Sequence, residues 1–251
     1  MKKVVGLCKY CGQEKTLIAS HIIPKSFYDM KNQGSYVGIN YKDSKLDKAR
    51  FQNGHKEHLL CAECDNKLGI LDRYAAHFLF TQVPDSALIY PEEMPLCPKW
   101  YFPKASFNFN LLRRFFISLV WRASICTLIP VSLERYEKVA LRILKHEQID
   151  DENLFVPLIY RRQTGTSSDL FSMTAVSHFL SSKHFYFRFP SYEILVLTDI
   201  YETNNIAYAK ALHRLFNRDG IEIYRISTNT PTDFSLINSL LTTRKKYKRT
   251  Y

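Results

Sequence analysis

Two pairs of cysteines constrain the fold of this chain more than any other feature of its sequence. Each pair has the spacing C-x2-C, with Cys8 and Cys11 in the first pair and Cys61 and Cys64 in the second. A C-x2-C turn directs both sulfur atoms toward one point, so two such turns can surround one metal ion. The pattern therefore predicts a structural Zn²⁺ held by four thiolates, and the alternative is a pair of disulfides or unrelated thiols.

A histidine-containing segment lies between the two cysteine pairs. Residues 20–24 read Ser-His-Ile-Ile-Pro, which is typical of an imidazole presented from a short strand before a proline corner. In an apolar context the simpler interpretation is a half-buried histidine that is hydrogen-bonded at a strand end. The position of His21 inside a frame of four cysteines favours a functional role instead.

These three motifs, in this order, resemble the HNH endonuclease family, whose fold is the ββα-metal fold. The resemblance covers about the first 80 residues and includes the Leu-Cys-x2-Cys-Asp stretch that ends at Asp65. It implies a β-hairpin pinned to a helix by the zinc, with His21 as the general base that activates water. It also implies that Asp65, or Asn66 beside it, takes the place of the family residue that orients this base.

The resemblance implies a second, catalytic cation, Mg²⁺ or Mn²⁺, at the scissile phosphate. Its ligands are expected from the residue before the base and from the helix that follows the second cysteine pair. Here Ser20 precedes the base, and the nearby side chains that can coordinate are Asp72, His58 and His55. Ser20 departs from the family pattern, because a hydroxyl is a poorer ligand for a hard cation than a carboxylate.

The charge of the chain favours an anionic partner. There are 35 Lys and Arg against 24 Asp and Glu, a formal net charge of +11. Nucleic acid is the commonest such partner of a basic protein, and we expect DNA, with RNA left open. The candidate contacts lie in an irregular insertion expected over residues 31–58 and in a basic tail over residues 244–251, and solvated segments are the alternative for both. They are Lys42, Lys45, Lys48, Arg50, Lys56, Lys245 and Lys246.

The cysteines and the apolar segments also indicate in which cellular compartment the protein is located. The other two cysteines, Cys97 and Cys126, are expected to be buried thiols. No signal peptide and no stretch of about 18 apolar residues is visible, so no membrane is expected as a partner. Thiolates that bind zinc fit the reducing cytoplasm, which is the predicted location.

The succession of helical, proline-rich and β-strand patterns along the chain predicts an α+β protein with two parts. Residues 1–83 form the small zinc module, a proline-rich linker covers 84–106, and a larger mixed helical and β domain covers 107–251. Helices are expected from apolar residues at helical spacing near 64–82, 107–128, 132–148 and 206–216, and strands near 155–160, 185–189, 192–197 and 221–226. The larger part carries no motif to which chemistry can be attached, so we expect it to select a substrate, a partner protein or an activation state.

The leading hypothesis is a metal-dependent HNH endonuclease or nickase that cuts DNA. By analogy with the family, a bacterial restriction or phage-defence setting is expected. The alternative is a catalytically inactive, zinc-stabilised nucleic-acid-binding module, which the departures at Ser20 and Asp65 motivate. A third hypothesis is a protein-interaction module, in which the net positive charge only keeps the protein in solution.

Overall fold

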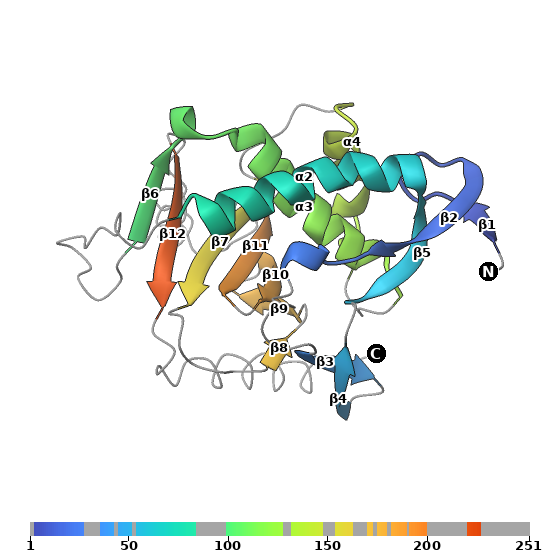
Figure 1. Cartoon of the computed structure of the whole chain (residues 1–251), viewed down its shortest axis with the longest axis horizontal. Coiled ribbons are helices and arrows are strands. Elements are labelled where there is room, and N and C mark those ends of the chain that lie inside the picture. Colours follow the sequence, from blue (N-terminus) through green and yellow to red (C-terminus); the bar gives the residue numbers. More distant parts are fainter. Residues whose placement is uncertain are drawn as a thin grey trace.

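The structure is a computed structural model that describes about three-fifths of the chain (Figure 1). The described residues are 3–27, 36–42, 45–51, 54–83, 99–127, 132–147, 154–162, 170–172, 175–179, 182–189, 191–199 and 220–226. They form three β-sheets and several helices, so the α+β class predicted from the sequence is confirmed. None of the helices described here is long and apolar enough to cross a membrane.

The N-terminal sheet has three antiparallel strands in the order β1-β2-β5. Its strands are β1 (Val4–Leu7), β2 (Glu14–His21) and β5 (Lys56–Cys61). The chain passes from β5 directly into α2 (Ala62–Thr81), whose buried positions recur with helical spacing, as predicted. An antiparallel strand pair followed by a helix is the local arrangement that the resemblance implies, although this arrangement alone identifies no family.

The segment between β2 and β5 is more regular than expected. After the short 3-10 turn η1 (Lys25–Phe27), the strands β3 (Tyr36–Lys42) and β4 (Lys45–Phe51) pair as an antiparallel hairpin. The strand β8 (Leu170–Ser172) extends this sheet parallel to β3. The prediction of an irregular insertion is therefore wrong over these strands. Their aromatic and β-branched residues favour strands, and the scattered glycines and lysines hid that signal.

The largest sheet has six strands in the order β6-β12-β7-β11-β10-β9. Only β12 and β7 are parallel, and the other neighbours are antiparallel. The strands are β6 (Lys99–Pro103), β7 (Leu154–Arg162), β9 (Ala175–Phe179), β10 (Ser182–Arg188), β11 (Tyr192–Asp199) and β12 (Gly220–Ile226). The four strands predicted in this region are all present.

Part of the predicted linker belongs to this sheet. β6 and the 3-10 turn η3 (Lys104–Ser106) both fall within residues 84–106, whereas 84–98 lie outside the described residues. β6 pairs closely with β12, since a Cβ atom on Gly220 would lie 2.4 Å from the carbonyl oxygen of Phe102. No side chain fits at position 220, and the backbones approach directly.

Two further helices pack between the sheets. The helix α3 (Phe109–Ile125) is almost entirely buried and lies against α2, and α4 (Tyr136–Leu144) packs against α3. Asn108 caps α3, because its side-chain oxygen accepts a hydrogen bond of 3.0 Å from the backbone N–H of Leu111. Both helices were predicted, whereas the helix expected near 206–216 lies outside the described residues.

One hydrophobic core connects the N-terminal sheet to the large sheet. The ring of Phe27 stacks on Phe115 at 5.2 Å and meets Phe189 at 4.9 Å between ring centroids. On the other side of α3, Tyr10 packs edge-on against Trp121, and its hydroxyl donates to the carbonyl of Leu144 at 2.9 Å. The division into domains at residues 83 and 107 stays a prediction, and the two parts share these contacts.

Candidate functional site

The four cysteines of the two C-x2-C pairs converge on one point. Cys8 and Cys11 lie in the turn between β1 and β2, Cys61 ends β5, and Cys64 lies in the first turn of α2. Their sulfur atoms all lie within 4.8 Å of one another, and three of the four residues are buried. Tetrahedral zinc with bonds of about 2.3 Å places its sulfurs about 3.8 Å apart. The cluster therefore fits a metal ion such as zinc, and all four cysteines are free thiols.

The backbone shapes the first cysteine turn. Gly12 adopts a positive φ of 73°, which glycine tolerates without strain, and its N–H donates to the carbonyl of Cys8 at 2.8 Å. The N–H of Lys9 donates to the carbonyl of Leu59 at 3.0 Å, which ties the turn to β5. The N–H of Cys61 in turn donates to the sulfur of Cys8 at 3.4 Å. These bonds hold the first cysteine turn against β5, next to the second cysteine pair.

The sulfur atoms have unequal proton affinities. Burial acts to raise the pKa of Cys8, but backbone N–H groups of Cys11, Cys61 and Tyr10 outweigh it and lower that pKa to about 7. Burial, together with the neighbouring sulfurs, raises the pKa of Cys64. The thiol of Cys8 thus ionises more easily than that of Cys64, and zinc binding would displace a proton from Cys64.

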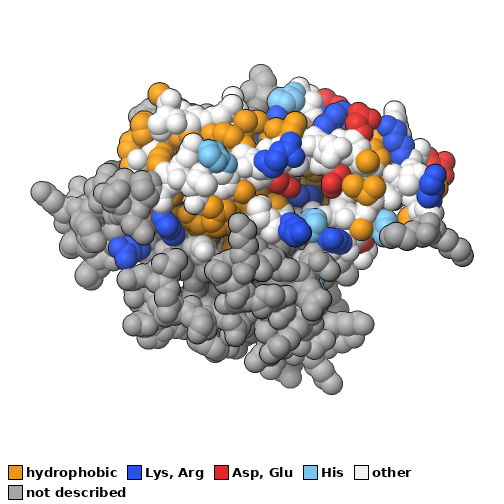
Figure 2. Space-filling view, in the orientation of Figure 1, with side chains coloured by type: hydrophobic (Ala, Val, Ile, Leu, Met, Phe, Trp, Pro, Cys, Tyr) orange, Lys and Arg blue, Asp and Glu red, His pale blue; other side chains and the backbone are white. Residues whose placement is uncertain are grey.

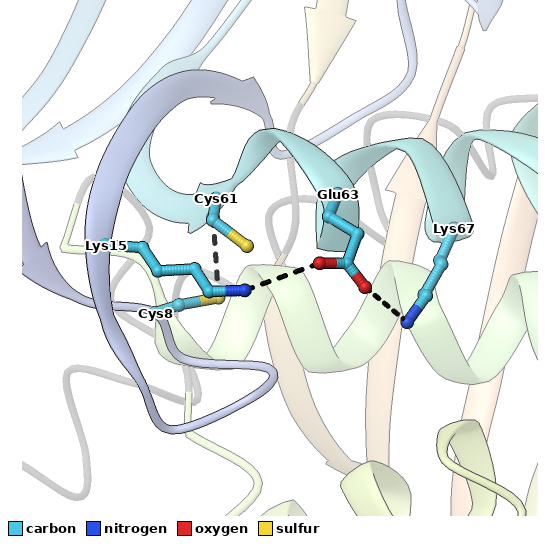
Figure 3. Close-up of polar contacts among 5 residues, drawn as sticks. All are labelled: Cys8, Lys15, Cys61, Glu63 and Lys67. Atoms are coloured by element: carbon cyan, nitrogen blue, oxygen red, sulfur yellow. Dashed lines mark hydrogen bonds and ion pairs between the residues drawn. The ribbon is translucent and has the colours of Figure 1, made fainter.

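Two lysines lie beside the cysteine cluster (Figure 3). Glu63 connects them, with its carboxylate oxygens 3.3 Å from the ammonium of Lys15 and 3.0 Å from that of Lys67. Both ammonium groups have raised pKa values, chiefly from Glu63 and to a lesser degree from the sulfurs of the cluster. Because a zinc ion with four thiolates has a net charge of −2, nearby cations offset part of that charge. These exposed pairs contribute little to the stability of the fold.

His21 is the last residue of β2, and the register of the hairpin decides which way it faces. A bulge between Ile18 and Ala19 shifts the pairing, so that His21 lies opposite Lys56, and Ser20 lies opposite Glu57. Successive side chains of a strand point to opposite faces. Ser20 is accordingly buried at 2% exposed, whereas His21 is partly exposed on the other face.

Asp72 forms an ion pair with an arginine that no sequence motif indicated. The guanidinium of Arg122 on α3 makes a bidentate ion pair with Asp72, with contacts of 2.6 and 2.9 Å. Arg122 is only 3% exposed, and it also donates to the backbone carbonyl of His21 at 3.3 Å. A fixed positive charge therefore lies between the end of β2 and α2, where the resemblance places the catalytic cation. The only indication of this ion pair in the sequence was a charged residue within an otherwise apolar helix.

The predicted ligands of the catalytic metal do not come together. Ser20 is on the buried face of β2, His58 is on the exposed face of β5, and Asp72 pairs with Arg122. Among the residues that the structure describes, the cysteine cluster is the one group of three or more His, Cys, Asp or Glu side chains that converges. The structure thus gives no support to a Mg²⁺ or Mn²⁺ site built from these residues.

Asp65 and Asn66 lie in the first turn of α2, directly after the cysteine cluster. Asp65 is partly exposed and Asn66 is exposed. Negative charge in a first helical turn interacts favourably with the helix dipole, which gives Asp65 a structural role as well. The predicted role of these residues toward His21 stays a prediction.

The basic residues predicted to contact nucleic acid fall mainly outside the described side chains. The backbones of Lys42, Lys45, Lys48 and Arg50 belong to β3 and β4, but the structure does not describe their side chains. Lys245 and Lys246 lie outside the described residues altogether, as does Cys97. Cys126 is buried, as predicted, and its thiol donates to the carbonyl of Ala123 at 3.3 Å.

Comparisons with protein-family models, with curated proteins and with solved structures found no match for this chain. The resemblance to the HNH family is therefore carried by the three sequence motifs alone. What the structure adds is a cysteine cluster at the base of a hairpin and a histidine at the far end of the same strand.

Buried His55 makes the stability of the fold depend on pH. The residue precedes β5, is 4% exposed, and has its pKa lowered by burial to about 4. Between pH 4 and about 6.5 the unfolded chain binds a proton there that the folded chain does not, so stability falls as the pH decreases through this range. We expect His55 to account for at most about 3 kcal/mol of that loss. Urea unfolding of wild type and His55→Gln at pH 7 and pH 5 checks this, and equal pH dependence of the two proteins would contradict it.

Proposed function

We propose that this chain is a zinc-stabilised endonuclease of the HNH type that hydrolyses phosphodiester bonds in DNA, with His21 as the general base. The observation that supports this most is the position of His21. It ends a strand whose other end is held at the cysteine cluster, and it faces the exposed side of the hairpin. A base on a rigid strand end can meet an extended, solvent-accessible substrate such as a nucleic-acid backbone.

The chemistry that this arrangement can perform is general-base hydrolysis. A neutral imidazole accepts a proton from water, and the water oxygen attacks the phosphorus atom. The new P–O bond forms as the bond to the leaving sugar oxygen breaks, and that oxygen takes a proton from solvent. Arg122 contributes by holding the backbone carbonyl of His21 and by fixing the end of β2 relative to α2.

Zinc has a structural role in this proposal. Cys8, Cys11, Cys61 and Cys64 would complete its coordination shell and leave no open position for a substrate or a water. The ion would lock the turn before β2 to the end of β5, so that His21 and its neighbours keep their register. No catalytic step is assigned to a second metal, because the predicted ligands do not converge.

Charge supports a nucleic-acid substrate. The net charge of the chain is +11, and Figure 2 shows Lys and Arg side chains gathered, with acidic ones between them, over the start of α2 and the N-terminal sheet. Apolar side chains dominate the opposite end of the same view. The net positive charge of the chain attracts a polyanion through long-range electrostatics.

The substitution His21→Ala, which removes the imidazole of the proposed base, tests this proposal. Zinc-loaded protein is incubated with supercoiled plasmid, and in parallel with RNA, without added divalent ion and with Mg²⁺ or Mn²⁺. We expect His21→Ala to lower the cleavage rate by about 10²–10⁴-fold, the usual contribution of a general base. His77→Ala is the matched control, because His77 is an exposed histidine on α2 that hydrogen-bonds within its own helix. Cleavage that survives His21→Ala would remove the proposed base.

A second candidate is a zinc-stabilised nucleic-acid-binding protein without catalysis. The ion pair between Arg122 and Asp72 favours it, because a guanidinium occupies the region expected for the catalytic cation. This candidate predicts salt-sensitive binding and no strand scission under any of the ion conditions above. The same plasmid assay on the wild-type protein therefore separates the two functions.

A further inference from the structure

The outer face of the β2–β5 hairpin carries basic side chains beside His21. Lys56 is directly opposite His21 in the antiparallel register, and His58 is opposite Ala19. Directly opposed residues have Cβ atoms about 4.5–5.5 Å apart, so the side chains of Lys56 and His21 are neighbours. Lys56, His58 and Ala19 are all exposed, and the small Ala19 leaves room between the longer side chains.

Two carboxylates of the described residues near this end of the hairpin, those of Glu57 and Asp72, are engaged by other groups. Glu57 lies between Lys56 and His58 in sequence but points to the opposite side of the strand. Its two oxygens accept hydrogen bonds from the backbone N–H of Thr127 at 2.8 Å and from the Thr127 hydroxyl at 3.1 Å. Asp72 is likewise neutralised by buried Arg122. The exposed face next to His21 is therefore basic, with no carboxylate among the four residues that form it.

We propose that Lys56 binds the phosphate of the nucleic-acid backbone beside His21, with His58 on the same strip of the hairpin. This inference rests on the proposed function and deepens it, since it names the residue that places the scissile phosphate. A lysine ammonium is a compact charge with three donors that suits phosphate oxygens. Among the residues described, Lys56 makes no ion pair, so its charge is available to a ligand.

Lys56 would also supply the positive charge that phosphodiester hydrolysis requires. Attack on a phosphodiester builds negative charge on the phosphoryl oxygens, and an adjacent cation stabilises that charge. The side chains predicted to hold a metal cation do not converge, whereas a lysine lies directly opposite the proposed base in the strand register. A phosphate contact of this kind fixes the position of the strand and carries no sequence information.

Binding and cleavage are measured separately to test this. Fluorescence anisotropy of a labelled duplex, at several salt concentrations and without added divalent ion, gives the affinity and its salt slope. We expect Lys56→Gln to weaken binding by about tenfold at low salt and to reduce the slope of log K against log salt by about 0.9. Lys56→Arg should retain most of the binding. Lys138→Gln, which removes an exposed lysine from α4, is the control and should change neither quantity.

The outcomes distinguish this inference from the proposed function. If Lys56→Gln binds and cleaves like wild type while His21→Ala is inactive, the role of Lys56 is overturned and the endonuclease proposal stands. If Lys56→Gln shows the expected loss of binding while His21→Ala still cleaves, Lys56 is supported and the base is wrong. A wild-type protein that binds no nucleic acid at low salt overturns both. Zinc content and the thermal unfolding midpoint of each variant confirm that the fold is intact.

Discussion

Cys61→Ser is expected to abolish stoichiometric zinc binding and to unfold the N-terminal sheet at room temperature. Cys61 ends β5, its N–H donates to the sulfur of Cys8, and the next residue starts α2. In small zinc modules the metal contributes on the order of 10 kcal/mol of apparent binding free energy. That is comparable to the whole stability of a typical domain, so the loss of one ligand outweighs the remaining contacts of this small sheet.

The measurement is zinc content per chain together with hydrogen exchange of the backbone amides. One zinc per wild-type chain, none in Cys61→Ser, and loss of protection in β2 and β5 are expected. Cys126→Ser is the matched control, since Cys126 is a buried cysteine on the C-terminal side of α3 that lies outside the cluster. It should retain its zinc. A Cys61→Ser protein with full zinc and unchanged protection would show that the cluster is not a metal site.

Asp72→Asn is expected to lower the free energy of unfolding by about 3–5 kcal/mol. The substitution removes the charge that compensates the buried guanidinium of Arg122, which is 3% exposed, and an uncompensated buried charge is costly. Asp72 itself is 17% exposed, so the lower end of that range is expected. Arg122→Met combined with Asp72→Asn should recover a large part of the loss, because no charge then remains buried without a partner.

Urea unfolding of the two single variants and the double variant measures this coupling. Lys67→Ala is the control, because its exposed ion pair with Glu63 should leave the unfolding midpoint nearly unchanged. A single variant that unfolds at the wild-type urea concentration would contradict the structural role of the pair. Because Arg122 also holds the carbonyl of His21, the same variants are expected to lower activity in the plasmid assay.

Much of the architecture could be predicted from local patterns. The convergence of the four sulfurs could be predicted from the two C-x2-C pairs, because the two cysteines of each pair lie in a single turn. The helices α2, α3 and α4 follow from apolar residues at helical spacing, and β7, β10, β11 and β12 from runs of β-branched and aromatic residues. The hairpin of β3 and β4 was missed, since glycines and lysines within it obscured the strand pattern.

The candidate site was harder to predict, because its geometry depends on contacts between distant parts of the chain. The register with β5 shifts by one residue between Ile18 and Ala19, since Ile18 pairs with Leu60 and Ala19 with His58. This shift sets the pairing of the last three residues of β2, and so places Lys56 opposite His21. Asp72 was a reasonable metal ligand by position on α2. Its actual partner is Arg122, 50 residues further along the chain. Nothing in the local sequence of either residue indicates that pairing.

The sequence by itself determined the two C-x2-C turns, the helices and strands of the α+β class and the presence of a histidine at the end of a strand, because each of these depends on residues within a turn or two of each other. Only the tertiary structure decided which charges surround that histidine. Packing of α3 against α2 and the hairpin buries Arg122 on Asp72, and brings Thr127 to Glu57 across 70 residues. Those two contacts hold the carboxylates on the buried side and leave a lysine beside His21 on the exposed side.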